Sequence, residues 1–199
     1  MKLKILNGDK KNFIQHLSKF LKKRKETQSK NLSMVKRIVN DVQSKGDKAI
    51  FKYERKFTKI KKLNKKFALS DREIIKIVKN LNKETKKSID IAFSRIEKFH
   101  KKQLFKSFKF RDKYHNEMSY RYMPIESVGV YVPGGRANYP SSVLMNCIPA
   151  KVAGVKKIYM TTPLYKTIPN PAVIYAAKKC GVKKIYKIGG AQAVAALAF

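Results

Sequence analysis

The chain has 199 residues, enough for one domain or two small ones with a real hydrophobic core. Its 47 basic and 13 acidic residues give a formal net charge of +34, which ordinarily suggests a nucleic-acid or anionic-membrane partner. However, 39 of the basic residues are Lys and are spread along the chain without any zinc-finger, RNP-like or helix-turn-helix signature, so we interpret the charge as compositional.

Membrane and secretory signals are not evident in the sequence. It has no run of 18 apolar residues, and the segment after Met1 is too short and too quickly charged for a signal peptide. Cys147 and Cys180 lack C-x-x-C spacing and are expected to be small buried side chains in a reducing compartment. We therefore expect a cytoplasmic protein without a membrane partner.

The first half of the chain has mainly helical patterns. After a short strand candidate at 2–6, apolar side chains at three- and four-residue spacing predict helices at residues 9–21, 31–45, 47–57, 70–78 and 82–102. Gly46 is expected to end the second helix, and Ser70 and Glu73 to form a capping box. A polar stretch separates the first two helices, and residues 59–66 form a lysine-dense connector. The first helix has one apolar side and is expected to dock.

Aromatic and polar residues alternate between Phe105 and Tyr122, which suits a strand pair or an extended connector. We place a domain boundary near Pro124. Residues 1–123 then form a mainly helical region, and residues 124–199 form a second domain.

The second domain alternates strands with helices. Strands are predicted at 128–132, 157–162 and 184–188, and helices from Pro140, from Pro171 to Cys180 and from Ala191. Ser141 or Ser142 can cap the first of these helices, and Asn170 the second. A βαβαβ order with crossovers of this length predicts an α/β fold with an incomplete Rossmann-like parallel sheet.

Three segments follow the three strands: Pro133–Gly135, Thr161–Thr162 and Gly189–Gly190. Right-handed crossovers bring them to one edge of the sheet, where such folds bind ligands. Neither glycine turn has G-x-G-x-x-G spacing, and no acidic residue follows Glu126, so the glycines can equally be plain tight turns. Arg136 can hold an anion there, or it can be a solvated loop residue.

Four runs in this domain, PIESVGVYVPGG, YPSSVLMNCIPAKVAGVKKI, AAKKCGV and IGGAQAVAALAF, closely resemble the histidinol dehydrogenase family. The resemblance implies a zinc enzyme that oxidises histidinol to histidine in two NAD-dependent steps and works as a homodimer with exchanged segments. It also implies that Tyr131 and Gln192 contact NAD. On the residues alone, Tyr131 can be a packed sheet aromatic and Gln192 a solvated residue of a first helical turn.

The same resemblance implies a truncated chain, about half the length of a family member, whose zinc ligands and Glu-His acid/base pair lie beyond Phe199. His16, His100 and His115 lack metal-binding spacing, so we assign no catalytic or zinc-binding residue to this chain. We expect the isolated chain to be inactive and poorly soluble. A basic nucleic-acid-binding module and an inactive remnant of the family stay open as alternatives.

Overall fold

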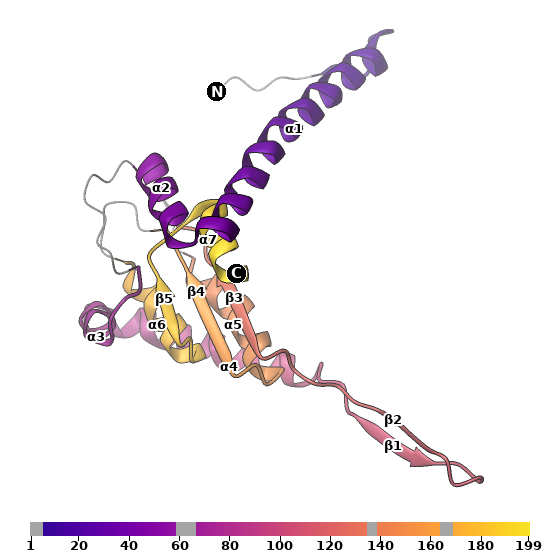
Figure 1. Cartoon of the computed structure of the whole chain (residues 1–199), viewed down its shortest axis with the longest axis vertical. Helices are drawn as coiled ribbons and strands as arrows, with labels where there is room; N and C mark the ends of the chain where they lie inside the picture. The colour runs from indigo at the N-terminus through magenta and orange to yellow at the C-terminus, as the bar shows by residue number, and fades with distance from the viewer. Residues whose placement is uncertain (1–5, 59–66, 135–138, 164–168) are drawn as a thin grey trace.

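The computed structural model describes residues 6–58, 67–134, 139–163 and 169–199, with the side chains of 23–31 outside the description. A central body carries two projections, the first helix and a two-stranded arm (Figure 1). The helices are α1 (Phe13–Lys45), α2 (Asp47–Thr58), α3 (Asp71–Lys79), α4 (Lys83–Lys101), α5 (Pro140–Val152), α6 (Pro171–Cys180) and α7 (Gly190–Ala198). The strands are β1 (Phe108–Arg111), β2 (Glu117–Tyr120), β3 (Ser127–Tyr131), β4 (Lys157–Thr161) and β5 (Lys184–Tyr186).

The parallel sheet predicted for the second domain is confirmed. Its order is β3-β4-β5, with Tyr131 beside Thr161 and Thr161 beside Tyr186. A segment of the first half was not foreseen beside it: Ala68 forms an antiparallel bridge with Tyr186, and Leu69 N–H donates to the Ile185 carbonyl at 2.9 Å. Part of the N-terminal region therefore extends the sheet beyond β5.

The two faces of this sheet pack against different helices. Side chains alternate along each strand, so Val130, Met160 and Ile185 lie in one core with α4, α5 and α6. Tyr131 and Tyr186 lie in a second core with α1, α2 and α7. Helix α7 comes so close to β3 that a Cβ added at Gly129 would meet the Leu197 side chain at 2.7 Å.

Side chains from both sides of Pro124 share these cores. Ile77, Ile89 and Phe93 of the helical region pack with the sheet residues in the first of them. The division into 1–123 and 124–199 stays a proposal about folding units. The core shows what the two parts bury against each other, and both are needed to cover the sheet.

Helix α1 corrects two expectations. It is one continuous helix of 33 residues rather than two, because the polar stretch between the expected helices consists mostly of residues that favour helix. Its C-terminal end is docked, with Ile38 and Val42 buried, whereas Ile14 near its N-terminus is 69% exposed. The docking expected for residues 9–21 is therefore wrong within this structure, as Figure 1 shows.

Most predicted helix ends are confirmed. Gly46, with φ of 53°, follows α1, and Ser70 and Glu73 form both hydrogen bonds of the capping box of α3. Asn170 caps α6, and Gly181 follows it in the left-handed region. Helix α5 differs from its prediction, since it begins at Pro140, its N-cap residue is Tyr139, and no side chain caps it. The cap expected from Ser141 or Ser142 is thus wrong, because both lie inside the first turn.

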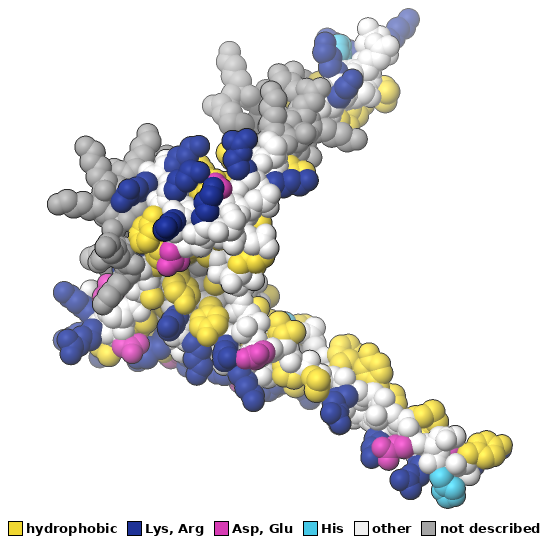
Figure 2. Space-filling view, viewed as in Figure 1, with side chains coloured by type: hydrophobic (Ala, Val, Ile, Leu, Met, Phe, Trp, Pro, Cys, Tyr) yellow, Lys and Arg dark blue, Asp and Glu magenta, His cyan; other side chains and the backbone are white. Residues whose placement is uncertain are grey.

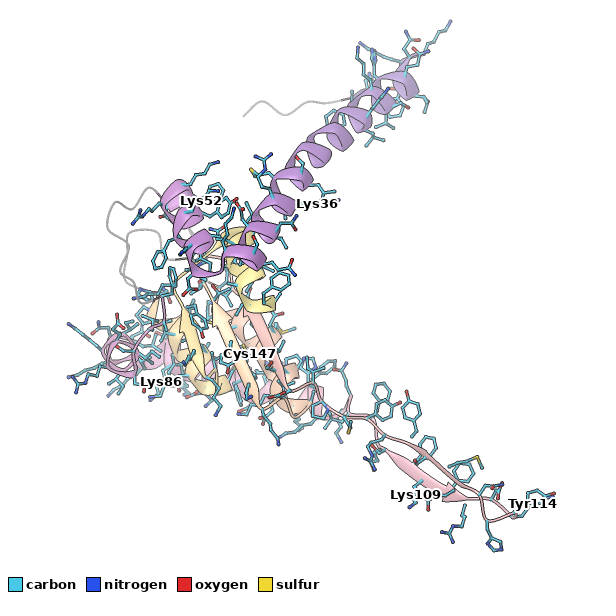
Figure 3. All side chains as sticks on the ribbon, in the orientation of Figure 1. Lys36, Lys52, Lys86, Lys109, Tyr114 and Cys147 are labelled. Atoms are coloured by element: carbon cyan, nitrogen blue, oxygen red, sulfur yellow. The ribbon has the colours of Figure 1, made fainter. Side chains whose placement is uncertain are left out.

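The strand pair between Phe105 and Tyr122 is confirmed as an antiparallel hairpin, with Phe108 opposite Tyr120 and Phe110 opposite Met118. Cys147, marked in the body in Figure 3, and Cys180 are both buried and free, as expected. The Cys180 thiol and burial raise the pKa of the Cys147 thiol above its usual range.

Over the residues described, no helix is long and apolar enough to cross a membrane. Most of the strand expected at 2–6 and all of the 59–66 connector lie outside the described residues.

Candidate functional site

The segments that follow the three parallel strands meet at one edge of the sheet, as predicted. Hydrogen bonds continue the pairing past the strand ends: Val132 N–H donates to the Thr161 carbonyl at 2.9 Å, and Thr162 N–H to the Tyr186 carbonyl at 3.0 Å. The buried Thr161 hydroxyl donates to the Ile188 carbonyl at 2.6 Å. The edge is therefore held by a network of backbone groups before any ligand is considered.

Two glycines at this edge are required by packing. A Cβ at Gly134 or at Gly189 would meet the Cγ of Pro163 at 2.9 Å, and in both cases another Pro163 atom lies closer still. Neither residue has positive φ. Glycine stands here because the loops after β3 and β5 both press on Pro163, which follows β4. This close contact between loops, rather than room for a ligand, explains Gly134 and Gly189.

Tyr131 and Gly190 join the ends of β3 and β5. Tyr131, the last residue of β3, is half-buried, and its hydroxyl accepts a hydrogen bond from Gly190 N–H at 3.2 Å. Because a phenol oxygen can accept and donate at once, its own O–H stays able to donate to a ligand. Gly190 has φ of 69° and is exposed, so the turn presents backbone at the surface.

Gln192 lies in the first turn of α7, and its side chain is buried rather than solvated, at 2% exposure. The amide Nε2 donates to Glu54 Oε1 at 2.9 Å. The amide oxygen Oε1 is buried and, among the residues described, has no hydrogen-bond partner. A Cβ added at Gly190 would meet this oxygen at 2.9 Å, so the oxygen lies close against the bare backbone of Gly190.

Glu54 is the acidic residue that the sequence interpretation missed. It belongs to α2, is 3% exposed, and its Oε1 also accepts from Gly189 N–H at 3.1 Å. The sequence indicates its position, because helical spacing places Glu54 on one face with Ile50, Tyr53 and Phe57. A carboxylate on that apolar face needs a polar partner inside the protein. The same spacing predicts that Phe57 faces inward, but its side chain is 40% exposed.

An ionic cluster fixes the helix that carries Glu54. Asp41 of α1 accepts from the Tyr53 hydroxyl at 2.6 Å and from Lys52 Nζ at 3.1 Å. Lys45, then Tyr53 and Lys52, hold the pKa of the Asp41 carboxyl well below its usual range. The hydrogen bond that the Tyr53 hydroxyl donates to Asp41 raises the pKa of Tyr53 in turn. Asp41 thus anchors α2 on α1 one residue away from Glu54.

NAD and zinc differ in how they fit these residues. A dinucleotide carries hydroxyl and amide groups, which suit an edge with an unpartnered buried oxygen, a phenol and an open glycine turn. Zinc needs several converging His, Cys or carboxylate ligands, and the described residues contain no group of three such side chains. The residues described do not fit zinc. Gly135 and Arg136 lie outside them, so the anion interpretation of Arg136 stays a prediction.

Comparison with known proteins agrees with this architecture. The family model described as histidinol dehydrogenase matches residues 21–199. A histidinol dehydrogenase of Pelagibacter ubique is 49% identical over 197 residues, which cover 99% of this chain and 45% of the relative. One from Prochlorococcus marinus is 40% identical over 199 residues, covering 99% of this chain and 46% of the relative.

A solved structure shows the same likeness in three dimensions. The crystal structure of histidinol dehydrogenase from Elizabethkingia anophelis matches with a TM-score of 0.77 and 36% identity, over 84% of this chain and 39% of that one. The chain thus spans less than half the length of the relatives it matches. With the parallel sheet in place and a family match over most of its length, the chain belongs to the histidinol dehydrogenase family.

Proposed function

We propose that the chain forms part of the NAD site of a histidinol dehydrogenase, which oxidises histidinol to histidine in two NAD-dependent steps. The observation that carries this proposal is the convergence of Tyr131 and Gln192, from separate strand and helix ends, on the single turn Gly189–Gly190. Residues 131 and 192 are 61 positions apart in sequence, and a shared turn at the carboxyl edge of a parallel sheet is where such folds bind ligands.

Each residue has a defined part in binding. The Tyr131 hydroxyl, which already accepts from Gly190 N–H, donates a hydrogen bond to an acceptor atom of the ligand. The exposed Gly190 turn lets the ligand approach the backbone, because glycine has no side chain of its own. When bound, NAD supplies the hydride acceptor for the oxidation of the alcohol. The protein groups at this edge orient the cofactor, and none of them is assigned a proton-transfer step.

The wider features of the family enter as proposals too. Histidinol is the proposed substrate, a homodimer the proposed assembly and the cytoplasm the proposed location. Zinc is a proposed cofactor of the complete enzyme, although the described residues do not fit it. An inactive remnant of the family would still show the NAD site described above, so binding and turnover must be measured separately.

A basic nucleic-acid-binding module is the alternative from another class. Figure 2 shows lysine and arginine side chains scattered over α1, the body and the arm on this face, with apolar and acidic side chains between them. Nucleic-acid sites gather basic residues into a continuous patch or stripe. The scattered arrangement supports a compositional origin of the charge, and we do not propose a nucleic-acid partner.

Calorimetric titration of the 199-residue chain with NAD⁺ tests the proposal. We expect saturable binding, weakened about five- to tenfold by Gln192→Ala and by Tyr131→Phe, since each variant removes one hydrogen-bonding group from the ligand. Tyr114→Phe is the matched control, because Tyr114 lies at the far end of the arm in Figure 3 and is exposed. Equal affinity in all four proteins would show that NAD⁺ binds elsewhere.

A second titration separates this function from the alternative. Binding of a random-sequence DNA duplex is measured at several salt concentrations. If the lysines bind DNA phosphates, binding releases counterions, and the affinity for DNA falls steeply as the salt concentration rises. Tight DNA binding with such a slope, together with no NAD⁺ binding, would favour the nucleic-acid module.

A further inference from the structure

Glu54 is a buried carboxylate that links the N-terminal helical region to the candidate site. Its Oε1 accepts two hydrogen bonds, from Gly189 N–H and from Gln192 Nε2, at 3.1 and 2.9 Å. Both partners lie more than 130 positions away in sequence. The acid therefore holds the turn after β5 and the first turn of α7 with one oxygen atom.

This contact decides which way the Gln192 amide faces. Glu54 Oε1 accepts a hydrogen bond from Gly189 N–H, whereas an amide has a donating nitrogen and an accepting oxygen. The reversed amide would bring two acceptor oxygens to hydrogen-bond distance in a buried setting, which is unfavourable. Side-chain amides are often ambiguous in their two orientations, but a neighbouring carboxylate removes the ambiguity. With the nitrogen on Glu54, Oε1 is the atom left over.

The Gln192 Oε1 atom lies where it can contact a ligand. It is buried and lacks a partner among the described residues, and it lies against the exposed Gly190 turn, where an added Cβ would meet it at 2.9 Å. The Tyr131 hydroxyl reaches the same glycine through its backbone N–H. An unpaired buried oxygen is costly to a folded protein, so a ligand that donates to it is bound more tightly for that reason.

We propose that Glu54 is a positioning residue, which fixes the Gln192 amide so that Oε1 accepts a hydrogen bond from a hydroxyl or amide N–H group of the ligand. The inference rests on the proposed NAD site. It adds that Gln192 selects a donor group on the cofactor. It also makes the helical region, through α2, part of the cofactor site.

The test uses the full 199-residue chain and two measurements. Heteronuclear NMR follows the Nε2 protons of Gln192 without ligand, and titration gives the NAD⁺ dissociation constant. In the wild-type chain we expect the amide protons to be shifted and protected from exchange by the carboxylate. Glu54→Ala is expected to abolish that protection and weaken NAD⁺ binding about tenfold. Glu54→Gln, which keeps an acceptor oxygen, is expected to stay within about threefold of wild type.

Asp90→Ala is the control for a merely structural effect. It removes a carboxylate of α4 that accepts a hydrogen bond from the Tyr175 hydroxyl, away from α2 and the Gly189–Gly190 turn, so it lowers stability while leaving the Gln192 signal and NAD⁺ affinity in place. Unprotected Gln192 protons in the wild-type chain, or protection that survives Glu54→Ala, would overturn the inference even if NAD⁺ binds. Unchanged affinity in Glu54→Ala with the signal lost would also overturn it. Protected protons that depend on Glu54 without NAD⁺ binding would support the positioning and refute the proposed cofactor.

Discussion

Pro163 is the residue on which the geometry of the site depends most directly. The loops after β3 and β5 both touch it, through Gly134 and Gly189, and it follows β4. The three strand ends are therefore packed as a single unit around one rigid ring. A change in any of these three residues is transmitted to the other two loops.

Gly189→Ala is expected to destabilise the protein by about 1–3 kcal/mol, the usual cost of forcing an extra methyl into a packed site. The backbone of Gly189 is extended, so the cost is steric and arises at Pro163. Urea unfolding followed by circular dichroism measures it. Gly8→Ala is the matched control, with open space around its Cα and an expected effect within about 0.5 kcal/mol. Equal stability of the two variants would refute the packing explanation.

The sequence predicts some residues of the site and not others, for physical reasons. Tyr131 and Gln192 were assigned through a resemblance in motifs, and the structure brings both to the Gly189–Gly190 turn. The glycines were predicted at the correct edge, either as ligand contacts or as plain tight turns. Their packing role was missed because a sequence does not show that Pro163 lies between them. Glu54 could be found as an acid on an apolar helix face, yet its partners are distant pairings that no local pattern encodes.

Helix ends are the elements that the sequence predicts best, because their signals lie within a few residues. Gly46, the capping box at Ser70 and the Asn170 cap are all local chemistry. Expectations failed where the outcome depends on context. The polar stretch inside α1 has no strong helix breaker, and Pro140 starts α5 ahead of both serines.

Glu73 gives α3 a stability that depends on pH. Hydrogen bonds from the Ser70 backbone and hydroxyl, and then the charge of Lys187, lower the pKa of its carboxyl in the folded state. A lowered folded pKa means that this stabilisation is complete above the ordinary glutamate pKa of about 4.3. It is lost as the pH falls from there through the folded value.

Glu73→Gln is therefore expected to flatten the acid limb of the stability curve. Gln keeps an acceptor for the Ser70 N–H but does not titrate, so its stability deficit at pH 7 should shrink as the pH falls below 4. Urea unfolding at a series of pH values gives the difference. A constant deficit across the series would mean that the Glu73 carboxyl titrates alike in the folded and unfolded chains.

In the whole molecule, the arm formed by β1 and β2 projects from the body, and one face of this arm is apolar. Its larger apolar side chains are exposed, namely Phe108, Phe110, Met118, Tyr120 and Tyr122. Phe108 pairs with Tyr120 and Phe110 with Met118 across the hairpin, so these four share a face. An isolated two-stranded hairpin with such a face is marginally stable in water. Association with another molecule would cover this face and stabilise the hairpin.

We expect the 199-residue chain to self-associate through this face as its concentration rises. The double variant Phe108→Ser, Phe110→Ser should raise the monomer fraction, because it removes apolar area from one side of the arm. Size-exclusion chromatography with light scattering at several concentrations measures the mass. Lys109→Ser on the opposite side of β1 is the control and should leave association unchanged. A monomeric wild-type chain at every concentration would contradict the expectation.

Helix α1 extends for about 50 Å at the usual rise per residue, and of its described side chains the buried ones, Ile38 and Val42, lie near its C-terminal end. A helical segment of some ten largely exposed residues is marginal in water. Backbone amides near Ile14 should therefore exchange with deuterium through local fraying, while those near Val42 exchange only when the body unfolds. Peptide-resolved mass spectrometry would show this gradient, whereas uniform protection along α1 would contradict it. Deuterium exchange at the N-terminal end of α1 thus reports local fraying. Exchange in the last turns of α1 reports the stability of the body that contains Glu54 and the candidate site.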